Sequence, residues 1–176
     1  MPLKFWNDKN DLKFRNAYFN RFKNIWHHGD YAEIKNNGGY IIHGRSDTTL
    51  NPGGVRLGTA EIYSEVEKFK EIKESIVVGQ SWDNDVRIVL FIVMSKNYLL
   101  TAELINKIKL QIKKNASPRH IPSKIIVVKD IPRTKSGKIV ELAVKSRIEG
   151  SEIKNMEALA NPEALENYGN LKELSF

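Results

Sequence analysis

Alternating helix-like and strand-like patterns of apolar residues fill the chain from about residue 59 to residue 150. Apolar residues recur with helical spacing at about 59–69 and 102–114, and a last helix is predicted at about 139–149. Strand-like apolar stretches lie between them at about 74–80, 87–94 and 123–130, and the second is the most continuously apolar, as expected of a central strand. Thr59 is the predicted N-cap of the first helix, and Gly150 is predicted to end the last. The pattern predicts an α+β domain whose central sheet of about three strands is flanked by helices.

The segments on either side of this region have different patterns. Aromatic residues at positions 14, 18, 19 and 22 are spaced like the apolar stripe of a helix. Residues 31–45 alternate around an Asn-Asn-Gly-Gly turn, which predicts a β-hairpin, and the chain offers no evident sheet for this hairpin to join. Residues 151–176 are predicted to form short helical turns that pack on another part of the protein.

Composition excludes several classes of protein. The 176 residues suffice for one well-buried core, and 41% hydrophobic with 28% charged residues is ordinary for a folded globular chain. No apolar run approaches the roughly 18 residues that a transmembrane helix needs, and the first ten residues lack the apolar core of a signal peptide. Cysteine is absent, which excludes disulfides and thiolate metal sites and is compatible with a cytoplasmic location.

The net charge of +7 favours a phosphate-rich ligand, such as a nucleotide, coenzyme A or nucleic acid. A solvated, lysine-rich surface would give the same excess. The chain has no arginine-rich run interleaved with aromatic residues, which weakens the nucleic-acid interpretation without removing it.

A short basic loop at 131–138, "IPRTKSGK", is the first candidate for chemistry. A P-loop would need a glycine five residues before its Gly-Lys pair, but that position holds Pro132, which has no backbone N–H to offer a phosphate. The P-loop interpretation therefore fails. What remains is Lys138 on a loop that Gly137 allows to turn sharply.

Four motifs occur in a fixed order along the chain: "HGD" at 28–30, "HGRSD" at 43–47, "NPGGVRLGTAEIY" at 51–63 and "IPRTKSGK" at 131–138. Together they resemble the C-terminal region of the adenylate-forming acyl-CoA synthetase superfamily. The stretches "IWHHGDYAE", "SPRHIP" and "ALANPEALE" are similar to the branch that activates acetoacetate. Departures from other branches are Asn51, where many members have lysine, His28, where many have threonine, and Val55, where acetate-activating members have histidine.

The resemblance implies a domain organisation. Residues 1–46 would be the end of the large adenylation domain, including its last strands, 47–150 the small mobile C-terminal domain, and 151–176 a helical tail. The family's ATP loop and acyl pocket lie upstream of this region, so the chain is expected to be a fragment that is inactive alone. Its expected partner is the N-terminal domain of the same enzyme, rather than nucleic acid or a membrane.

The resemblance also implies a reaction and cofactors. A carboxylate, here acetoacetate, would react with ATP to give an acyl-adenylate and pyrophosphate, and the thiol of coenzyme A would then displace AMP. Mg²⁺ would accompany ATP in the N-terminal domain. An acetyl-CoA or propionyl-CoA synthetase is the alternative enzyme, and a basic nucleic-acid-binding module is the alternative outside enzymes.

Site residues follow from the motifs, one by one. Lys138 matches the catalytic lysine of adenylation, where an ammonium can bridge an attacking carboxylate and an α-phosphate. Asp30 matches a residue that accepts hydrogen bonds from the ribose, and Arg45 matches a contact to ribose and phosphate. Without the resemblance, each would be interpreted as a surface or turn residue.

The remaining candidates lie around the turn at 51–54. Asp47 matches the hinge about which the small domain rotates. Gly54 matches the loop that lines the coenzyme A channel, where a side chain would block the thiol, and Arg56 matches a phosphate contact in the nucleotide site. The four histidines, at 27, 28, 43 and 120, lack metal-ligand spacing, so structural roles and no metal site are expected. Glu61 and Glu65 are interpreted as solvated carboxylates on one helix face.

Overall fold

A computed structural model describes residues 2–175, which form two compact units, one up to residue 30 and one from residue 31 onward. In the first unit, a 3-10 turn, η1 (Lys9–Asp11), leads into helix α1 (Leu12–Tyr18). The Asp8 carboxylate accepts hydrogen bonds from the backbone N–H groups of Lys13 and Phe14, both at 2.8 Å, and so satisfies the free donors at the start of this helix.

The predicted aromatic stripe of the first unit is helical only in part. The rings of Phe5, Phe14 and Tyr18 meet edge to face, with centroids 5.4–5.8 Å apart. The helix ends at Tyr18, whose carbonyl accepts a hydrogen bond from the N–H of His27 at 2.8 Å, so the chain folds back at this point. Phe22 consequently lies outside the helix and is 47% exposed.

The second unit begins with the predicted hairpin. Strand β1 (Asp30–Ile34) begins at the last residue of the first unit and pairs with β2 (Tyr40–Arg45) in a separate two-stranded sheet. The turn between them closes through the N–H of Lys35 and the carbonyl of Gly39 at 2.8 Å. The hairpin prediction is confirmed, and its apolar side chains are exposed: Tyr40 by 70%, Ile41 by 40% and Ile42 by 56%.

A three-stranded mixed sheet forms the centre of the second unit, with the order β3-β4-β5. Strands β3 (Ile72–Trp82) and β4 (Asp85–Met94) are antiparallel and are joined by a turn in which Asp83 and Asn84 both have positive φ. Strand β5 (Lys124–Val127) runs parallel to β4. The predicted central strand, β4, is therefore the middle one.

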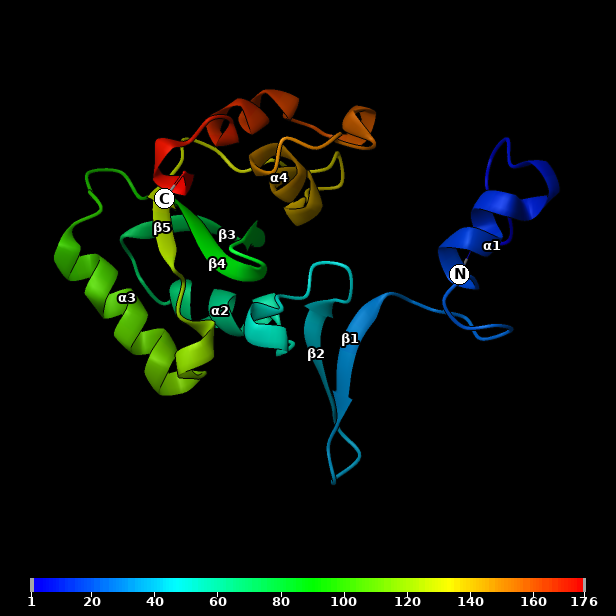
Figure 1. The fold of residues 1–176 in the computed structure, drawn as a ribbon, viewed down its shortest axis with the longest axis horizontal. Helices are drawn as coiled ribbons and strands as arrows, with labels where there is room; N and C mark the ends of the chain where they lie inside the picture. The colour runs from blue at the N-terminus through cyan, green and yellow to red at the C-terminus, as the bar shows by residue number, and fades with distance from the viewer. Residues whose placement is uncertain (1, 176) are drawn as a thin grey trace. The chain divides into compact units, whose positions relative to one another are not determined.

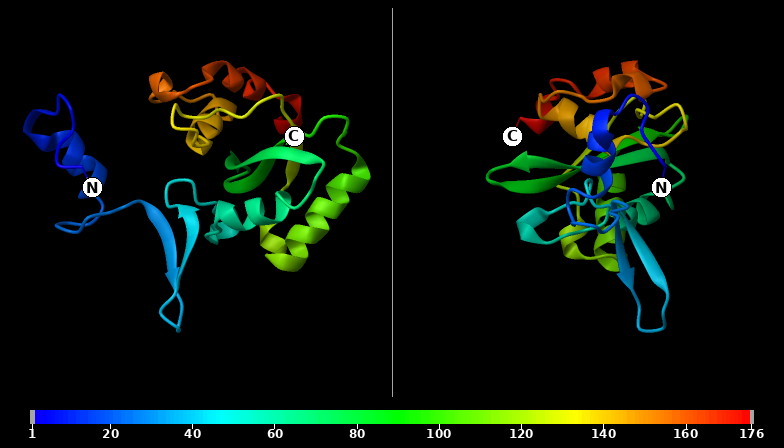
Figure 2. Two further views of the ribbon diagram at one scale, coloured as in Figure 1. Left: turned by 180° about the vertical axis from the view of Figure 1, so that it is seen from behind. Right: turned by 90° about the vertical axis from the view of Figure 1, so that its right-hand side faces the viewer.

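Helices cover both faces of this sheet, as Figures 1 and 2 show. One layer contains α2 (Thr59–Val66) and α3 (Ala102–Asn115), and the other contains α4 (Glu141–Ile148) and the tail. Alternate strand residues divide between them, because Ile76 and Val78 of β3 face α4 and the tail whereas Val77 faces α2 and α3. The α+β prediction is confirmed.

The tail consists of short helical turns, as predicted. The 3-10 segments are η4 (Met156–Ala158), η5 (Pro162–Tyr168) and η6 (Lys172–Leu174). They complete the layer of α4 by burying Leu159, Leu165, Tyr168 and Leu174 against the sheet. Tyr168 is fully buried, where its ring meets the edge of Phe91 and its hydroxyl donates to the carbonyl of Asp130 at 3.0 Å.

The start of α2 corrects one prediction. Thr59 is the first helical residue and is not the N-cap, which is Gly58. Gly58 has no side chain to cap the helix, and the carboxylate of Glu61 supplies only the reciprocal half of a capping box, by accepting a hydrogen bond from the Gly58 N–H at 3.3 Å. A larger residue than glycine does not fit, because an added Cβ would lie 2.4 Å from the carbonyl oxygen of His43.

Candidate functional site

Lys138 lies on a tight loop between β5 and α4. The N–H of Thr134 donates to the carbonyl of Lys138 at 2.8 Å, and the N–H of Lys138 donates to the hydroxyl of Thr134 at 3.1 Å. Gly137 has a φ of +81°, a left-handed conformation that lets the chain reverse here. The Lys138 side chain is exposed and makes no hydrogen bond or ion pair with any residue between 2 and 175. The loop therefore presents a free ammonium group to solvent.

Gly54 lies on a second loop, formed by η2 (Pro52–Gly54). Two buried residues, Leu50 and Leu57, hydrogen-bond to each other across its base at 3.0 and 2.9 Å. The N–H of Gly53 donates to both carboxylate oxygens of Asp85, at 2.9 and 3.0 Å, which fixes the loop to the β3–β4 turn.

The tip of this loop is open. Gly54 has a φ of +77°, and no atom lies within 4 Å of the position that a Cβ would occupy. A shallow hollow beside it is lined mainly by the β3–β4 turn, from Ser81 to Val86. Arg56, two residues further on, is exposed. The arrangement leaves space for an extended ligand to pass directly over backbone.

The hinge candidate Asp47 lies in a turn with Arg45. Its carboxylate is 3.3 Å from the Nε of Arg45, and the carbonyl of Arg45 accepts hydrogen bonds from the N–H of Thr48 and the hydroxyl of Thr49. Both charged side chains are about half exposed, so this pair adds little stability. Asp30 is the last residue of the first unit, where its carboxylate is 2.6 Å from the Nδ1 of His28.

The two candidate loops belong to opposite layers of the second unit. Leu50 and Leu57, which flank the Gly54 loop, are buried with α2 and α3. Ile131, which precedes the Lys138 loop, is buried with α4 and the tail. Figure 1 shows these layers on the two sides of the sheet. The structure thus brings Arg45 and Asp47 together and anchors Gly54 and Lys138 in opposite layers.

Two histidines have the structural roles that were predicted for them. The Nε2 of His43 is 3.0 Å from a carboxylate oxygen of Glu33 on the neighbouring strand. The Nε2 of His120 is 2.7 Å from a carboxylate oxygen of Glu61, and its Nδ1 is 2.8 Å from the hydroxyl of Ser117. These contacts tie the hairpin together and the segment after α3 to α2.

Glu65 is not the solvated carboxylate that was predicted. It is buried, and it accepts hydrogen bonds from Lys68 at 2.7 Å, Gln111 at 2.9 Å and Asn115 at 2.8 Å. The hydrogen bond from Lys68, followed by that from Asn115, lowers the pKa of this carboxyl. Glu65 therefore joins α2 to α3.

One further buried polar group, the hydroxyl of Tyr63, connects α2 to α4. The Tyr63 hydroxyl donates to Glu141 at 2.6 Å, and burial raises the pKa of this tyrosine well above its ordinary value. Among residues 2–175, no three His, Asp or Glu side chains are arranged to hold a metal ion. Within the same range, no helix is both long and apolar enough to cross a membrane.

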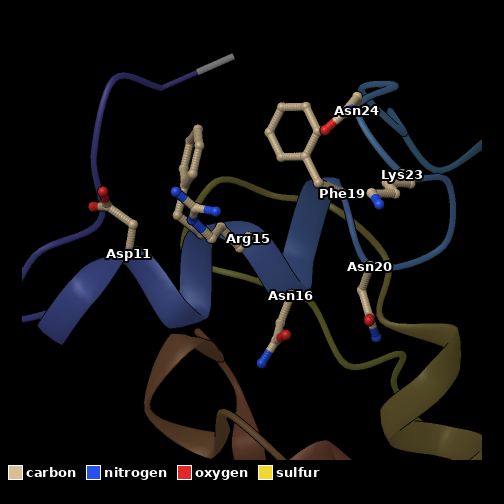
Figure 3. Close-up of a pocket in the computed structure, with 8 residues that line it drawn as sticks. Asp11, Arg15, Asn16, Phe19, Asn20, Lys23 and Asn24 are labelled. Atoms are coloured by element: carbon tan, nitrogen blue, oxygen red, sulfur yellow. The ribbon is translucent and has the colours of Figure 1, made fainter.

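A hollow in the first unit contains none of the predicted site residues. Figure 3 shows its lining, which comes from α1 and the turns on either side of it and is mainly polar: Asp11, Arg15, Asn16, Asn20, Lys23 and Asn24, with the ring of Phe19 among them. It involves only residues between 11 and 24. Nothing in its geometry resembles a catalytic arrangement.

The class of protein follows from these features together with a family match. Residues 61–138, which span most of α2, the whole central sheet and the Lys138 loop, match the family model of the AMP-binding enzyme C-terminal domain. The chain therefore contains an AMP-binding enzyme C-terminal domain region.

The match to particular proteins extends over nearly the whole chain. The chain is 58% identical over 174 residues to an acetoacetyl-coenzyme A synthetase of Rhizobium meliloti (strain 1021). It is 46% identical over 175 residues to an acetoacetyl-CoA synthetase of Gallus gallus. These alignments cover 99% and 98% of this chain but only 27% and 26% of the relatives. The solved acetoacetyl-CoA synthetase of Streptomyces lividans matches with a TM-score of 0.88 and 37% identity, over 96% of this chain and 26% of that one. The chain is thus an AMP-binding C-terminal domain region that matches acetoacetyl-CoA synthetases.

Proposed function

We propose that this chain is the C-terminal part of an acid–CoA ligase that converts acetoacetate, ATP and coenzyme A into acetoacetyl-CoA, AMP and pyrophosphate. The observation that carries the proposal is the 58% identity to an acetoacetyl-coenzyme A synthetase across 99% of the chain, tail included. Because the chain spans about a quarter of that relative, the ATP loop and the acyl pocket belong, in this proposal, to the rest of the parent enzyme. The proposal includes the domain limits at 46/47, between the large domain and the small one, and at 150/151, between the small domain and the tail.

Lys138 is the proposed catalytic residue of adenylation. When a carboxylate attacks the α-phosphate of ATP, two anions approach each other, and a cation between them lowers the free energy of the transition state. The ammonium of Lys138 is exposed and has no ion-pair partner among the described residues, 2–175, so within them no ion pair has to break before it takes this role. Its exposure also means that another domain must close over it to exclude water.

Gly54 is proposed to line the channel of coenzyme A in the second half-reaction. Its open backbone suits the passage of a pantetheine arm, and Arg56 would contact a phosphate group of the nucleotide. Since the Gly54 and Lys138 loops are anchored in opposite layers, one rotation of the small domain about Asp47 could exchange them at a single site.

The nucleotide would be held by two residues near the hinge. Asp30 would accept hydrogen bonds from the ribose hydroxyls, and Arg45 would donate to ribose and phosphate oxygens. In the present conformation the guanidinium of Arg45 faces Asp47, so nucleotide binding would exchange that partner. Mg²⁺ accompanying ATP is part of the proposal. A cytoplasmic location is also part of it and is supported only by the cysteine-free sequence.

Two measurements on the full-length parent enzyme test the function. The first compares AMP release with acetoacetate, acetate and propionate, and acetoacetate is expected to have the highest kcat/KM. The second measures the half-reactions of Lys138→Ala separately. Adenylation should fall by roughly a hundredfold or more, whereas thioester formation from pre-made acetoacetyl-adenylate should be largely retained. Equal losses in both half-reactions would mean that Lys138 has only a structural role.

A further inference from the structure

Arg133 spans the base of the Lys138 loop. One guanidinium nitrogen, Nη1, donates to the carbonyl of Gly137 at 3.0 Å, and the other, Nη2, donates to the carboxylate of Glu74 on β3 at 2.9 Å. The peptide that carries this carbonyl is the one that joins Gly137 to Lys138. The rigid sheet is thereby connected to the backbone of Lys138 through a single planar group.

The tail fixes the backbone of Arg133 from the other side. Its N–H donates to the side-chain oxygen of Asn161 at 2.8 Å, and its carbonyl accepts from the N–H of Ala160 at 2.8 Å. Asn161 is itself held, because its amide nitrogen donates to Asp130 and to the carbonyl of Ile131 at 2.7 and 3.0 Å. Arg133 therefore connects three elements: the tail, strand β3 and the turn that presents Lys138.

We propose that Arg133, supported by Glu74, is a positioning residue for Lys138 in the adenylation step; this inference rests on the proposed function. Gly137 gives the turn backbone freedom, and the Lys138 side chain has four rotatable carbon–carbon bonds and no partner among residues 2–175. Such a group would otherwise lose much conformational entropy on reaching its transition-state position. A guanidinium can make two separately directed hydrogen bonds, which an ammonium cannot do in the same geometry.

The charges around Arg133 support a positioning role over direct contact with substrate. Glu74 is the carboxylate that faces it, and the ammonium of Lys73 lies 3.8 Å from the other oxygen of that carboxylate. Arg133 is about one-third exposed and uses its guanidinium within the protein, on a carbonyl and on Glu74. Lys138, in contrast, is exposed and makes no hydrogen bond or ion pair through its ammonium within residues 2–175.

The effect is expected in one half-reaction. In the parent enzyme, Arg133→Ala should slow adenylation roughly tenfold and leave thioester formation from acetoacetyl-adenylate within about twofold, because only the first step uses Lys138. Arg133→Lys should restore only part of the rate, since it can replace one of the two hydrogen bonds. Glu74→Gln keeps an acceptor for Arg133 and should lose less than Arg133→Ala.

A double-mutant cycle provides the decisive measurement. If Arg133 acts through Lys138, adding Arg133→Ala to Lys138→Ala should cost almost nothing further in adenylation. A full tenfold loss in that background would overturn the inference, and so would equal losses in both half-reactions with folded protein. A failure of the proposed function would give a different result: Lys138→Ala alone would leave adenylation intact. If Arg133→Ala does not fold, Glu74→Gln and Arg133→Lys carry the same cycle.

Discussion

Glu65 connects α2 to α3, and its removal should destabilise the domain measurably. Its side chain is only 9% exposed and accepts three hydrogen bonds, two of them from amide groups on α3. A hydrogen bond to a charged group contributes about 1.5 kcal/mol at the lower end, and the partly exposed Lys68 adds little. Glu65→Ala should therefore reduce the free energy of unfolding by about 2–4 kcal/mol.

The loss should depend on pH with a definite sign. The pKa of Glu65 is lowered in the folded state, above all by the hydrogen bond from Lys68, relative to an ordinary value of 4.5. A lowered folded-state pKa means that the stabilisation is present above the unfolded-state pKa and is lost as the pH falls through the folded-state pKa. The difference between the wild-type chain and Glu65→Gln should thus be largest near neutral pH and shrink below about pH 4.5.

Chemical denaturation of the 176-residue chain, at neutral and at acidic pH, measures these differences. Glu103→Gln is the matched control. Glu103 pairs with Lys107 on the surface of α3 at 2.6 Å, but both side chains are largely exposed, so its loss should change the free energy of unfolding far less than the loss of Glu65. Equal effects of the two substitutions at neutral pH, or a Glu65 effect that grows as the pH falls, would refute the reasoning.

Three further predictions concern the chain as a whole. The isolated 176-residue chain should not turn over ATP with acetoacetate, and any activity above a no-protein control in an AMP-release assay would contradict the fragment proposal. Amide hydrogens of residues 31–45 should exchange faster than those of β4 in a dilute monomer, because the hairpin forms a two-stranded sheet with exposed apolar side chains; full protection would be the contrary result. Gly58→Ala should lower stability by about 1–3 kcal/mol in thermal unfolding, because its methyl group would overlap the carbonyl of His43, whereas Gly39→Ala in the hairpin turn should cost less.

Much of the fold could be predicted because its signals are local. Helices α2 and α3 each have an apolar stripe, the β1–β2 hairpin has an Asn-Asn-Gly-Gly turn, and β4 is a continuous apolar run flanked by polar residues. The predicted N-cap of α2, Thr59, was wrong for a reason that is not local in the sequence. The threonine at 59 is a good capping residue, but the close approach of His43 requires glycine at 58, and Glu61 then supplies the acceptor.

For the candidate site, the sequence pointed only to residues at the tips of loops. Motif order led to the prediction of Lys138 and Gly54, and the structure places both on exposed loops. Arg133 lies within the same motif, yet its role depends on Glu74, which is 59 residues away, and on Asn161, which is 28 residues away. The partners of Glu65 are 46 and 50 residues away. Such pairings arise from the packing of layers, which periodicity does not encode.

The tail has a consequence for the order of events during biosynthesis. Leu165, Tyr168 and Leu174 fill the layer over one face of the sheet, and the carbonyl of Leu174 accepts a hydrogen bond from Arg87 of β4 at 2.6 Å. Until these residues have left the ribosome, that face of the sheet, including Phe91, lacks part of its cover. The domain can therefore complete its core only after residue 174 has been released from the exit tunnel, and a nascent chain stalled before that point would expose an apolar surface on which chaperones can act.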